Sequence, residues 1–299
     1  MRKQIHDNPI DHGRACALSH GTWRRVGAKL ACAGACALMV GQLLLPSVAL
    51  AAKWVNVGGT QYNKGAGDEA GTWSWDGADD MKLNGYNGAG ISAQGNLNIG
   101  VTGTNTVTAD SLRSAIEVKD GNLAITGEGI LNATAEPQKS RSAVKVECGS
   151  LAISGDVTLN ATAGTDTIAV SGDGKTGGDM DIRGANVNVT ATNKAPHTIG
   201  IHTRAGNITI NEGADVHVEA EANGGLNAVA VYAENISCEY GGCIAVDNAK
   251  LDAAARNGCS VSVALYSSGG KDTYLSVTNG ADVTLVASDR ADVLDGVWM

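Results

Sequence analysis

A short apolar-x-apolar step recurs about every 30 residues from residue 90 onward, usually after a Gly or an Asp. Side chains of a strand alternate between its two faces, so such a step predicts a short strand with one buried face. The steps are Leu97/Ile99, Leu123/Ile125, Leu151/Ile153, Met180/Ile182, Ile208/Ile210, Ile244/Val246 and Leu275/Val277.

Another short alternating run lies on each side of every step, so each repeat predicts three strands. The preceding runs contain Ile91, Ile116/Val118, Val144/Val146, Ile168/Val170, Ile199/Ile201, Val229/Val231 and Val263/Leu265. The following runs contain Val107, Leu131, Leu159, Val187/Val189, Val216/Val218, Leu251 and Val283/Leu285.

Three strands in a constant order predict a parallel β-helix, whose coils stack about 4.8 Å apart over a column of buried aliphatic side chains. An antiparallel sandwich also has short strands, but it does not predict the same triplet recurring in register. We therefore expect an all-β, right-handed parallel β-helix of about seven coils over residues 89–299.

Segment 52–88 lacks the repeat and is rich in aromatic residues, namely Trp54, Tyr62, Trp73, Trp75 and Tyr86. The first coil of a solenoid must be covered, because its unpaired strand edges and apolar interior would otherwise meet water. We expect this segment to form an aromatic N-terminal cap.

Residues 1–51 have the organisation of a secretory signal peptide. A basic region that ends at Lys29 precedes an apolar run from Leu30 to Leu45, and Ala49-Leu50-Ala51 supplies the small-x-small pattern of a cleavage site. We expect cleavage after Ala51 and a secreted or cell-surface protein. The alternative is an uncleaved anchor over residues 30–52, which would be the chain's only attachment to a membrane.

Composition supports a thin aliphatic core and a polar ligand. The chain has no Phe, only 4% aromatic residues and a formal net charge of -9, so nucleic acid is not an expected partner. The leader carries six of the 22 basic and two of the 31 acidic residues, which leaves a charge of -13 on the remainder. Such surface carboxylates either bind calcium or only increase solubility.

Four motifs near the start of the predicted solenoid resemble a known family. They are GTWSWD (71–76), MKLNGYNG (81–88), GNLNI (95–99) and GTNTVT (103–108). They resemble the carbohydrate-binding β-helix domain of surface and secreted proteins of Gram-positive bacteria, which is related in fold to pectate lyases. The resemblance covers residues 71–290 and implies binding of extracellular polysaccharide, with acidic sugars and calcium as candidate ligands and no established catalysis.

Alternation also predicts which side chains of the preceding strands point outward. One outward column reads Gln94, Lys119, Glu147, Ser171, His202, Tyr232 and Tyr266, and the column beside it reads Ser92, Glu117, Lys145, Ala169, Gly200, Ala230 and Ala264. The three rings, flanked by small residues, predict a shelf on which a sugar could stack, with Arg204 available for hydrogen bonds. The alternative is a ring ladder that only stabilises the sheet.

The same outward columns predict ion pairs between coils, Glu117 with Lys145 and Lys119 with Glu147. On the following strands they predict polar ladders. These read Asn132, Asn160, Asn188, His217 and Asp252, and beside them Thr134, Thr162, Thr190 and Glu219.

Two further groups of residues are candidates for a metal site and a disulfide. Asp76, Asp79 and Asp80 are candidate calcium ligands, although Asp beside Gly is also ordinary turn chemistry. Cys238 and Cys243 lie close together in one predicted loop, and an exported protein allows them to form a disulfide.

The function that these features favour is a secreted carbohydrate-binding or adhesion module for extracellular polysaccharide, including acidic polysaccharide. A polysaccharide lyase acting on polyuronates is the enzymatic alternative. Such an enzyme would need a carboxylate cluster and a base in one groove. A third possibility is a structural spacer that binds no ligand.

Overall fold

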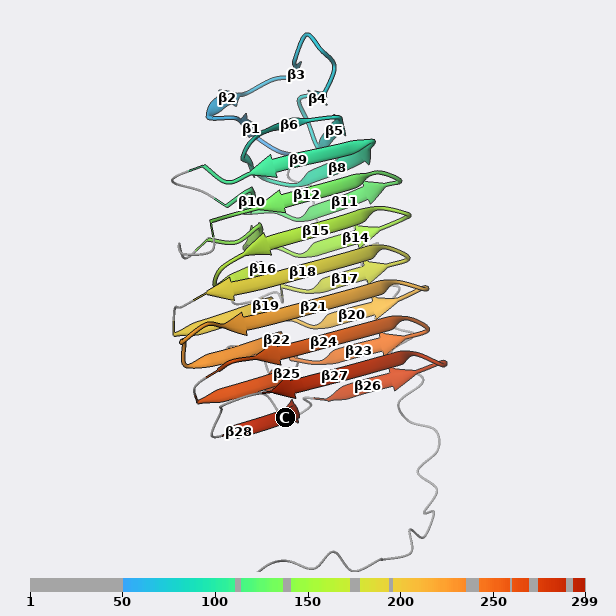
Figure 1. Ribbon diagram of the computed structural model, residues 1–299. Helices are drawn as coiled ribbons and strands as arrows, with labels where there is room; N and C mark the ends of the chain where they lie inside the picture. Colours follow the sequence, from blue (N-terminus) through green and yellow to red (C-terminus); the bar gives the residue numbers. More distant parts are fainter. Residues whose placement is uncertain are drawn as a thin grey trace, which may run out of the picture. The chain divides into compact units, whose positions relative to one another are not determined.

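The computed structural model describes residues 51–110, 114–136, 141–172, 178–193, 196–234, 242–258, 260–268, 274–288 and 293–298, all within one compact unit, Ala49–Met299. Its regular structure in this part of the chain is β-strand (Figure 1). Within these residues no helix is long and apolar enough to cross a bilayer. The predicted leader lies outside them.

Three sheets run along the stack, each built from one strand of every repeat (Figure 1). The first sheet contains, in spatial order, β2 (Thr60–Tyr62), β1 (Trp54–Val57), β7 (Ile91–Gln94), β10 (Ile116–Lys119), β13 (Val144–Glu147), β16 (Asp166–Ser171), β19 (His197–Arg204), β22 (Asn227–Glu234), β25 (Val261–Ser268) and β28 (Val293–Trp298). From β7 onward its strands are parallel.

The second and third sheets follow the same order of repeats. The second sheet contains β3 (Ala66–Gly67), β4 (Trp73–Trp75), β5 (Asp80–Asn84), β8 (Leu97–Thr102), β11 (Leu123–Gly127), β14 (Leu151–Ser154), β17 (Met180–Arg183), β20 (Ile208–Asn211), β23 (Ile244–Asp247) and β26 (Leu275–Thr278). The third contains β6 (Asn87–Ala89), β9 (Thr104–Thr108), β12 (Ile130–Thr134), β15 (Thr158–Ala163), β18 (Asn186–Asn193), β21 (Asp215–Ala222), β24 (Lys250–Arg256) and β27 (Asp282–Ser288).

The predicted parallel β-helix is confirmed, and the register of the second sheet is the predicted one. Leu97 pairs with Leu123, Leu123 with Leu151, and Leu151 with Met180. The column continues through Ile208 and Ile244 to Leu275. The handedness of the winding and the number of coils stay predictions.

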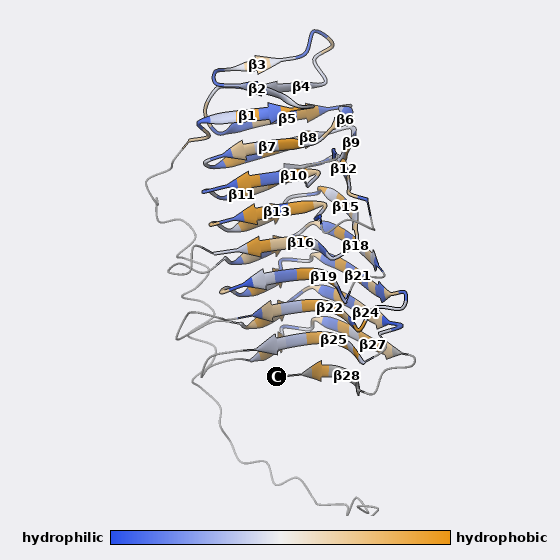
Figure 2. Cartoon of the chain, turned by 90° about the vertical axis from the view of Figure 1, so that its left-hand side faces the viewer, coloured by the Kyte–Doolittle hydropathy of each residue, from blue (hydrophilic) through white to orange (hydrophobic). Residues whose placement is uncertain are grey.

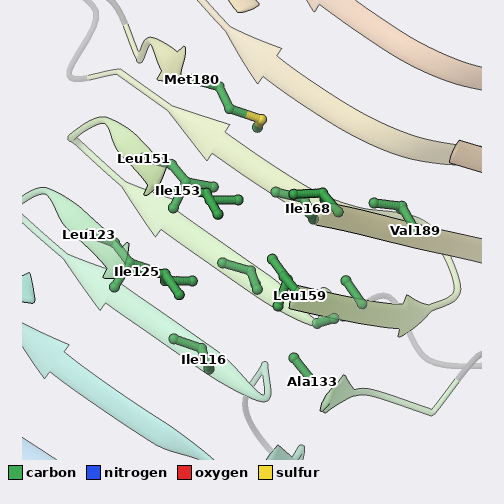
Figure 3. Packing of buried hydrophobic residues seen from close by; sticks show 14 of the residues in the cluster. Ile116, Leu123, Ile125, Ala133, Leu151, Ile153, Leu159, Ile168, Met180 and Val189 are labelled. Atoms are coloured by element: carbon green, nitrogen blue, oxygen red, sulfur yellow. The ribbon is translucent and has the colours of Figure 1, made fainter. Parts of the chain in front are cut away.

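The core is a stack of aliphatic side chains that point inward from all three sheets. Figure 3 shows Leu151 and Ile153 above the equivalent Leu123 and Ile125 of the preceding coil, with Leu159 contributed by the third sheet. These five side chains are at most 1% exposed. Burying each one contributes roughly 1.5–3 kcal/mol, so the core gains stability coil by coil without large aromatic residues.

Polar ladders cover the outer face of the third sheet as predicted. Asn132, Asn160 and Asn188 are in register. The side-chain amide of Asn160 donates to Asn132 Oδ1 over 2.8 Å, and that of Asn188 donates to Asn160 Oδ1 over 2.9 Å. Thr134, Thr162 and Thr190 form the parallel row. These bonds satisfy side chains that the repeat brings together, which is an architectural role.

The N-terminal segment closes one end of the solenoid with antiparallel strands. β1 pairs antiparallel with β2 and β7, and β4 pairs antiparallel with β3 and β5. Trp73, Trp75 and Tyr86 are buried here. However, β5 and β6 lie within the segment predicted as cap and pair in parallel with β8 and β9, so parallel stacking already begins at Asp80.

Candidate functional site

The three predicted rings form a continuous stack on the outer face of the first sheet. His202, Tyr232 and Tyr266 are in register on β19, β22 and β25. The ring centroids of His202 and Tyr232 are 4.7 Å apart with planes 5° from parallel, and those of Tyr232 and Tyr266 are 4.6 Å apart at 8°. We call these three residues the ring stack.

The stack does not present its ring faces to solvent as a shelf would. Tyr232 has His202 against one face and Tyr266 against the other, because β22 lies between β19 and β25. The distances between ring centroids match the spacing of neighbouring strands, so the ring planes lie perpendicular to the direction in which the coils stack. A sugar therefore cannot stack on Tyr232, and a free face can exist only at an end of the ring stack.

The small residues predicted beside the rings point inward, so that part of the prediction is wrong. Ala230 and Ala264 are completely buried, and so are Val231 and Leu265 directly after them. Two adjacent buried residues interrupt the alternation in these strands, a local feature typical of a β-bulge. A Cβ added at Gly200 would collide with the interior side chain of Val218.

The register between β16 and β19 also differs from the prediction by two residues. His202 lies beside Ala169, whereas Ser171 lies beside Arg204. Both Ile199 and Ile201 fit an alternating pattern, so the sequence does not show which of them pairs with Ile168. Interior packing selects Ile201, which pairs with Ile168, and so places a methyl group next to the His202 ring.

His202 lies between two carboxylates from the adjacent coils. Its Nδ1 is 3.4 Å from Asp166 Oδ1 on β16, and its Nε2 is 3.4 Å from Glu234 Oε2 on β22. The His202 side chain is 4% exposed, whereas those of Asp166 and Glu234 are 25% and 24% exposed. An imidazolium in this position bridges three coils.

The charge of this group follows from the competition between burial and the carboxylates. Burial disfavours the imidazolium, but the interactions with Asp166 and Glu234 outweigh it and raise the pKa of His202 above its usual 6.5. His202 in turn lowers the pKa of Glu234 below its usual 4.5. Burial raises the pKa of Tyr232 to about 12, so its hydroxyl, 3.1 Å from Ser268 Oγ, stays protonated.

A polar hollow of about 330 Å³ lies at the His202 end of the ring stack. Its walls come from β10, β13, β16 and β19 and the segments before β10, β13 and β16, and they consist of Ser114, Glu117, Arg141, Ser142, Lys145, Thr165, Asp166, Ala169, Val170, Ser171, His202 and Arg204. Ala169 contributes only a methyl group where the neighbouring coils carry the side chains of Lys145 and His202.

The hollow is more basic than the chain as a whole. Arg141, Lys145 and Arg204 line it together with two carboxylates, Glu117 and Asp166, although the chain carries a net charge of -9. The Arg204 side chain is 56% exposed, and its Nε lies 4.0 Å from Glu234 Oε2. The guanidinium is therefore able to contact a ligand while it shares Glu234 with His202.

The predicted charge columns align, but the ion pairs run along the strands. Glu117 is in register with Lys145, and Lys119 with Glu147. The contacts within 4.0 Å join Lys119 to Glu117 and Lys145 to Glu147, two residues apart in one strand. The Lys145–Glu147 pair is partly exposed and contributes little stability, whereas Glu117 in the other pair is buried. Lys145 and Glu117 also line the hollow.

The predicted calcium ligands have turn roles in this structure. Asp76 Oδ1 accepts the backbone N–H groups of Ala78 and Asp80, and Asp80 Oδ1 accepts the side-chain amide of Asn98. Asp79 Oδ1 is buried without a hydrogen bond. The described residues contain no group of three or more His, Cys, Asp or Glu placed to hold a metal ion.

The predicted disulfide involves a position that cannot be described. Cys243 is buried just before β23, and Cys238 lies outside the described residues.

Sequence reasoning placed Lys145 on the outward face of this sheet, but it missed the other residues that complete the site around His202 and Arg204. Asp166 and Glu234 bracket the histidine, while Arg141 and Lys145 supply positive charge to the hollow. Glu234 was detectable in principle, because it follows Tyr232 by two residues and so shares its outward face. Asp166 was not detectable in this way, because two adjacent buried residues interrupt the alternation of β16 directly after Asp166.

Comparison of the chain with protein-family models, with curated proteins and with solved structures finds no match.

Proposed function

We propose that the protein is a secreted carbohydrate-binding module that holds one sugar residue of an extracellular polysaccharide in the hollow at the His202 end of the ring stack. The observation that carries the proposal is the convergence in one hollow of a methyl group, the His202 end of the ring stack and several charged side chains. Binding sites for small ligands commonly combine a flat apolar surface with a few oriented polar groups.

The apolar contact would come mainly from the methyl group of Ala169, which lies beside His202 in the wall of the hollow. The His202 side chain is 4% exposed and covered by Tyr232 on one face, so it would form the boundary of the site and not a platform for the sugar. The rings of Tyr232 and Tyr266 would fix the orientation of His202 rather than touch the sugar. This assignment moves the ligand from the centre of the predicted shelf to its end.

The polar contacts would come from the charged walls. Asp166 and Glu117 are acceptors for sugar hydroxyls, whereas Arg141, Lys145 and Arg204 donate hydrogen bonds and favour an anionic ligand. The basic excess of the hollow therefore supports an acidic polysaccharide over a neutral one. Exposed charges are screened by salt, so affinity should fall as ionic strength rises.

Filling the hollow tests the proposal most directly. In Ala169→Tyr, the new ring would extend the ring stack and occupy the space of the sugar. We expect affinity for a polyuronate, measured by affinity electrophoresis or calorimetry, to fall at least about ten-fold while the melting temperature is retained. Ala124→Tyr, an outward position on β11 in the second sheet, is the matched control and should bind like the parent.

Two further variants separate this site from the alternatives. Arg204→Gln should weaken polyuronate binding and reduce its salt dependence. Tyr266→Ala should bind nearly as well as the parent, because Tyr266 does not line the hollow. A lyase would release unsaturated products that absorb in the ultraviolet, and a spacer would retain no polymer. If Ala169→Tyr bound as well as the parent, the hollow would not be the site.

A further inference from the structure

His202 is a buried histidine at the edge of the hollow. Its side chain is 4% exposed, and it is the one histidine among the described residues that line the hollow. Histidine is the side chain whose ordinary charge change falls between pH 5 and pH 8. A carboxylate ligand, which ionises near about pH 4, is charged throughout that range. The charge of His202 therefore changes while the charge of an acidic sugar does not.

The groups that face His202 come from both adjacent strands and from its own strand. Asp166 Oδ1 on β16 lies 3.4 Å from Nδ1, and Glu234 Oε2 on β22 lies 3.4 Å from Nε2. Tyr232, also on β22, covers one face of the ring as a neutral phenol. Arg204 follows His202 by two residues on β19, and its Nε lies 4.0 Å from the same oxygen of Glu234. His202 and Arg204 therefore share one carboxylate.

The proton on His202 decides whether both carboxylates have a partner. An imidazolium has an N–H on each nitrogen, so it serves Asp166 and Glu234 together. A neutral imidazole has one N–H and one lone pair, so one nitrogen then faces a carboxylate oxygen with no proton between them. The carboxylate that loses its partner must turn to water or to another cation. For Glu234 that cation is Arg204, whereas Asp166 lies in the wall of the hollow.

Loss of this proton makes the hollow less favourable for an anion in two ways. The described lining contains the acidic residues Glu117 and Asp166 and the basic residues Arg141, Lys145, His202 and Arg204. Deprotonation of His202 removes one of the four positive charges. It also leaves Glu234 with Arg204 as its remaining cationic contact within 4.0 Å among the described residues, which draws the guanidinium away from a ligand.

We propose that the hollow binds an acidic sugar together with a proton on His202, so that the protein holds its ligand in mildly acidic surroundings and releases it as pH rises. This inference rests on the proposed function, because it concerns the regulation of the same site. Burial opposes the imidazolium, but Asp166 and Glu234 raise the pKa of His202 above 6.5, so release should occur above that pH. By linkage, a bound anion should raise this pKa further, and binding should take up protons from solution.

Calorimetric titration of the full chain with polygalacturonate, at constant ionic strength, tests the coupling. The parent should bind at least about five-fold more tightly at pH 6 than at pH 9. His202→Phe keeps a ring in the stack, and it should bind at both pH values about as tightly as the parent does at pH 9. His197→Gln is the matched control, since His197 is an exposed histidine on the same strand, and it should keep the pH dependence of the parent.

Proton uptake measures the coupling without any substitution. Titrations of the parent between pH 7 and pH 9, in buffers of different ionisation enthalpy, should show a net uptake of protons on binding, and they decide the question if His202→Phe does not fold. Equal affinities of the parent at pH 6 and pH 9, no proton uptake, or a His202→Phe variant with the pH dependence of the parent would overturn the inference and leave the proposed function standing. A parent that binds no polygalacturonate at either pH would overturn both.

Discussion

At the scale of single residues, one buried polar side chain links the first coil of the solenoid to the cap. Asn105 is fully buried at a position where the next coil carries Leu131. Its Oδ1 accepts the backbone N–H of Tyr86 over 2.9 Å, and its Nδ2 donates to the carbonyl oxygen of Thr102 over 2.9 Å. Asn105 therefore ties the first coil to the segment before it, because both ends of its amide are satisfied.

His202 is another buried polar residue, and its charge makes stability depend on pH. Since its pKa is raised in the folded protein, the stabilisation by the imidazolium is fully present below its usual pKa of 6.5 and is lost as pH rises through the raised value. The lowered pKa of Glu234 adds stability that is present above 4.5 and is lost as pH falls through the lowered value.

His202→Phe keeps a ring in the stack and removes the charge between Asp166 and Glu234. We expect the free energy of unfolding to fall by about 1–3 kcal/mol at pH 5.5, because two carboxylates lose their shared counter-charge. The difference from the parent should shrink above the pKa of His202, where the parent imidazole is neutral. Urea unfolding across pH 4–9 measures both effects.

His197→Gln is the control for this profile, since His197 is an exposed histidine on the same strand whose Nδ1 lies 3.1 Å from the Asn227 amide. It should keep the pH dependence of the parent. A parent whose stability did not fall relative to His202→Phe between pH 6.5 and pH 9 would contradict the assigned charge.

At the scale of the elements, the strands form where period-two alternation is regular, and close turns hold them in register. Figure 2 shows this alternation of hydrophobic and hydrophilic residues along the first sheet, from β7 to β25. The turns between the first and second sheets stack backbone on backbone. At Gly149 an added Cβ would collide with the carbonyl oxygen of Gly121 in the turn of the preceding coil.

Gly149→Ala should therefore lower the free energy of unfolding by more than the different backbone preferences of Gly and Ala explain. A methyl group in this column pushes two coils apart, so we expect a loss of about 2 kcal/mol or more in chemical unfolding. Gly213→Ala is the comparison, because Gly213 has a φ of +80° but no atom within 4 Å of an added Cβ. It should cost only about 1–2 kcal/mol. Equal losses at the two positions would argue against the steric explanation.

At the scale of the whole molecule, stability accumulates along one dimension, since each coil contacts mainly its two neighbours. A coil in the middle is covered on both sides, whereas the coil that contains β26 is covered by described residues on one side. The same side chain in the same column should therefore contribute unequally along the stack. The exposures of Leu151 and Leu275 already show this gradient.

Leu151→Ala and Leu275→Ala compare the two environments with identical chemistry in one column. Leu151 is 1% exposed, and its truncation should cost about 2–5 kcal/mol. Leu275 is partly exposed, so the same truncation should cost under about half as much. Thermal or urea unfolding measures both, and equal costs would contradict a nearest-neighbour core.

The fold class, the positions of the repeating strands and the alignment of the ring stack could all be predicted from the amino-acid sequence. Each of these depends on local alternation repeated at a near-constant interval, which a linear pattern contains. Three features became visible only in the folded chain. They are the register between β16 and β19, the inward direction of Ala230 and Ala264, and the contacts of His202 with Asp166 and Glu234. These features depend on which of several equivalent apolar residues fills the core of the next coil. Packing between coils makes that choice, because no signal within a single strand distinguishes the candidates.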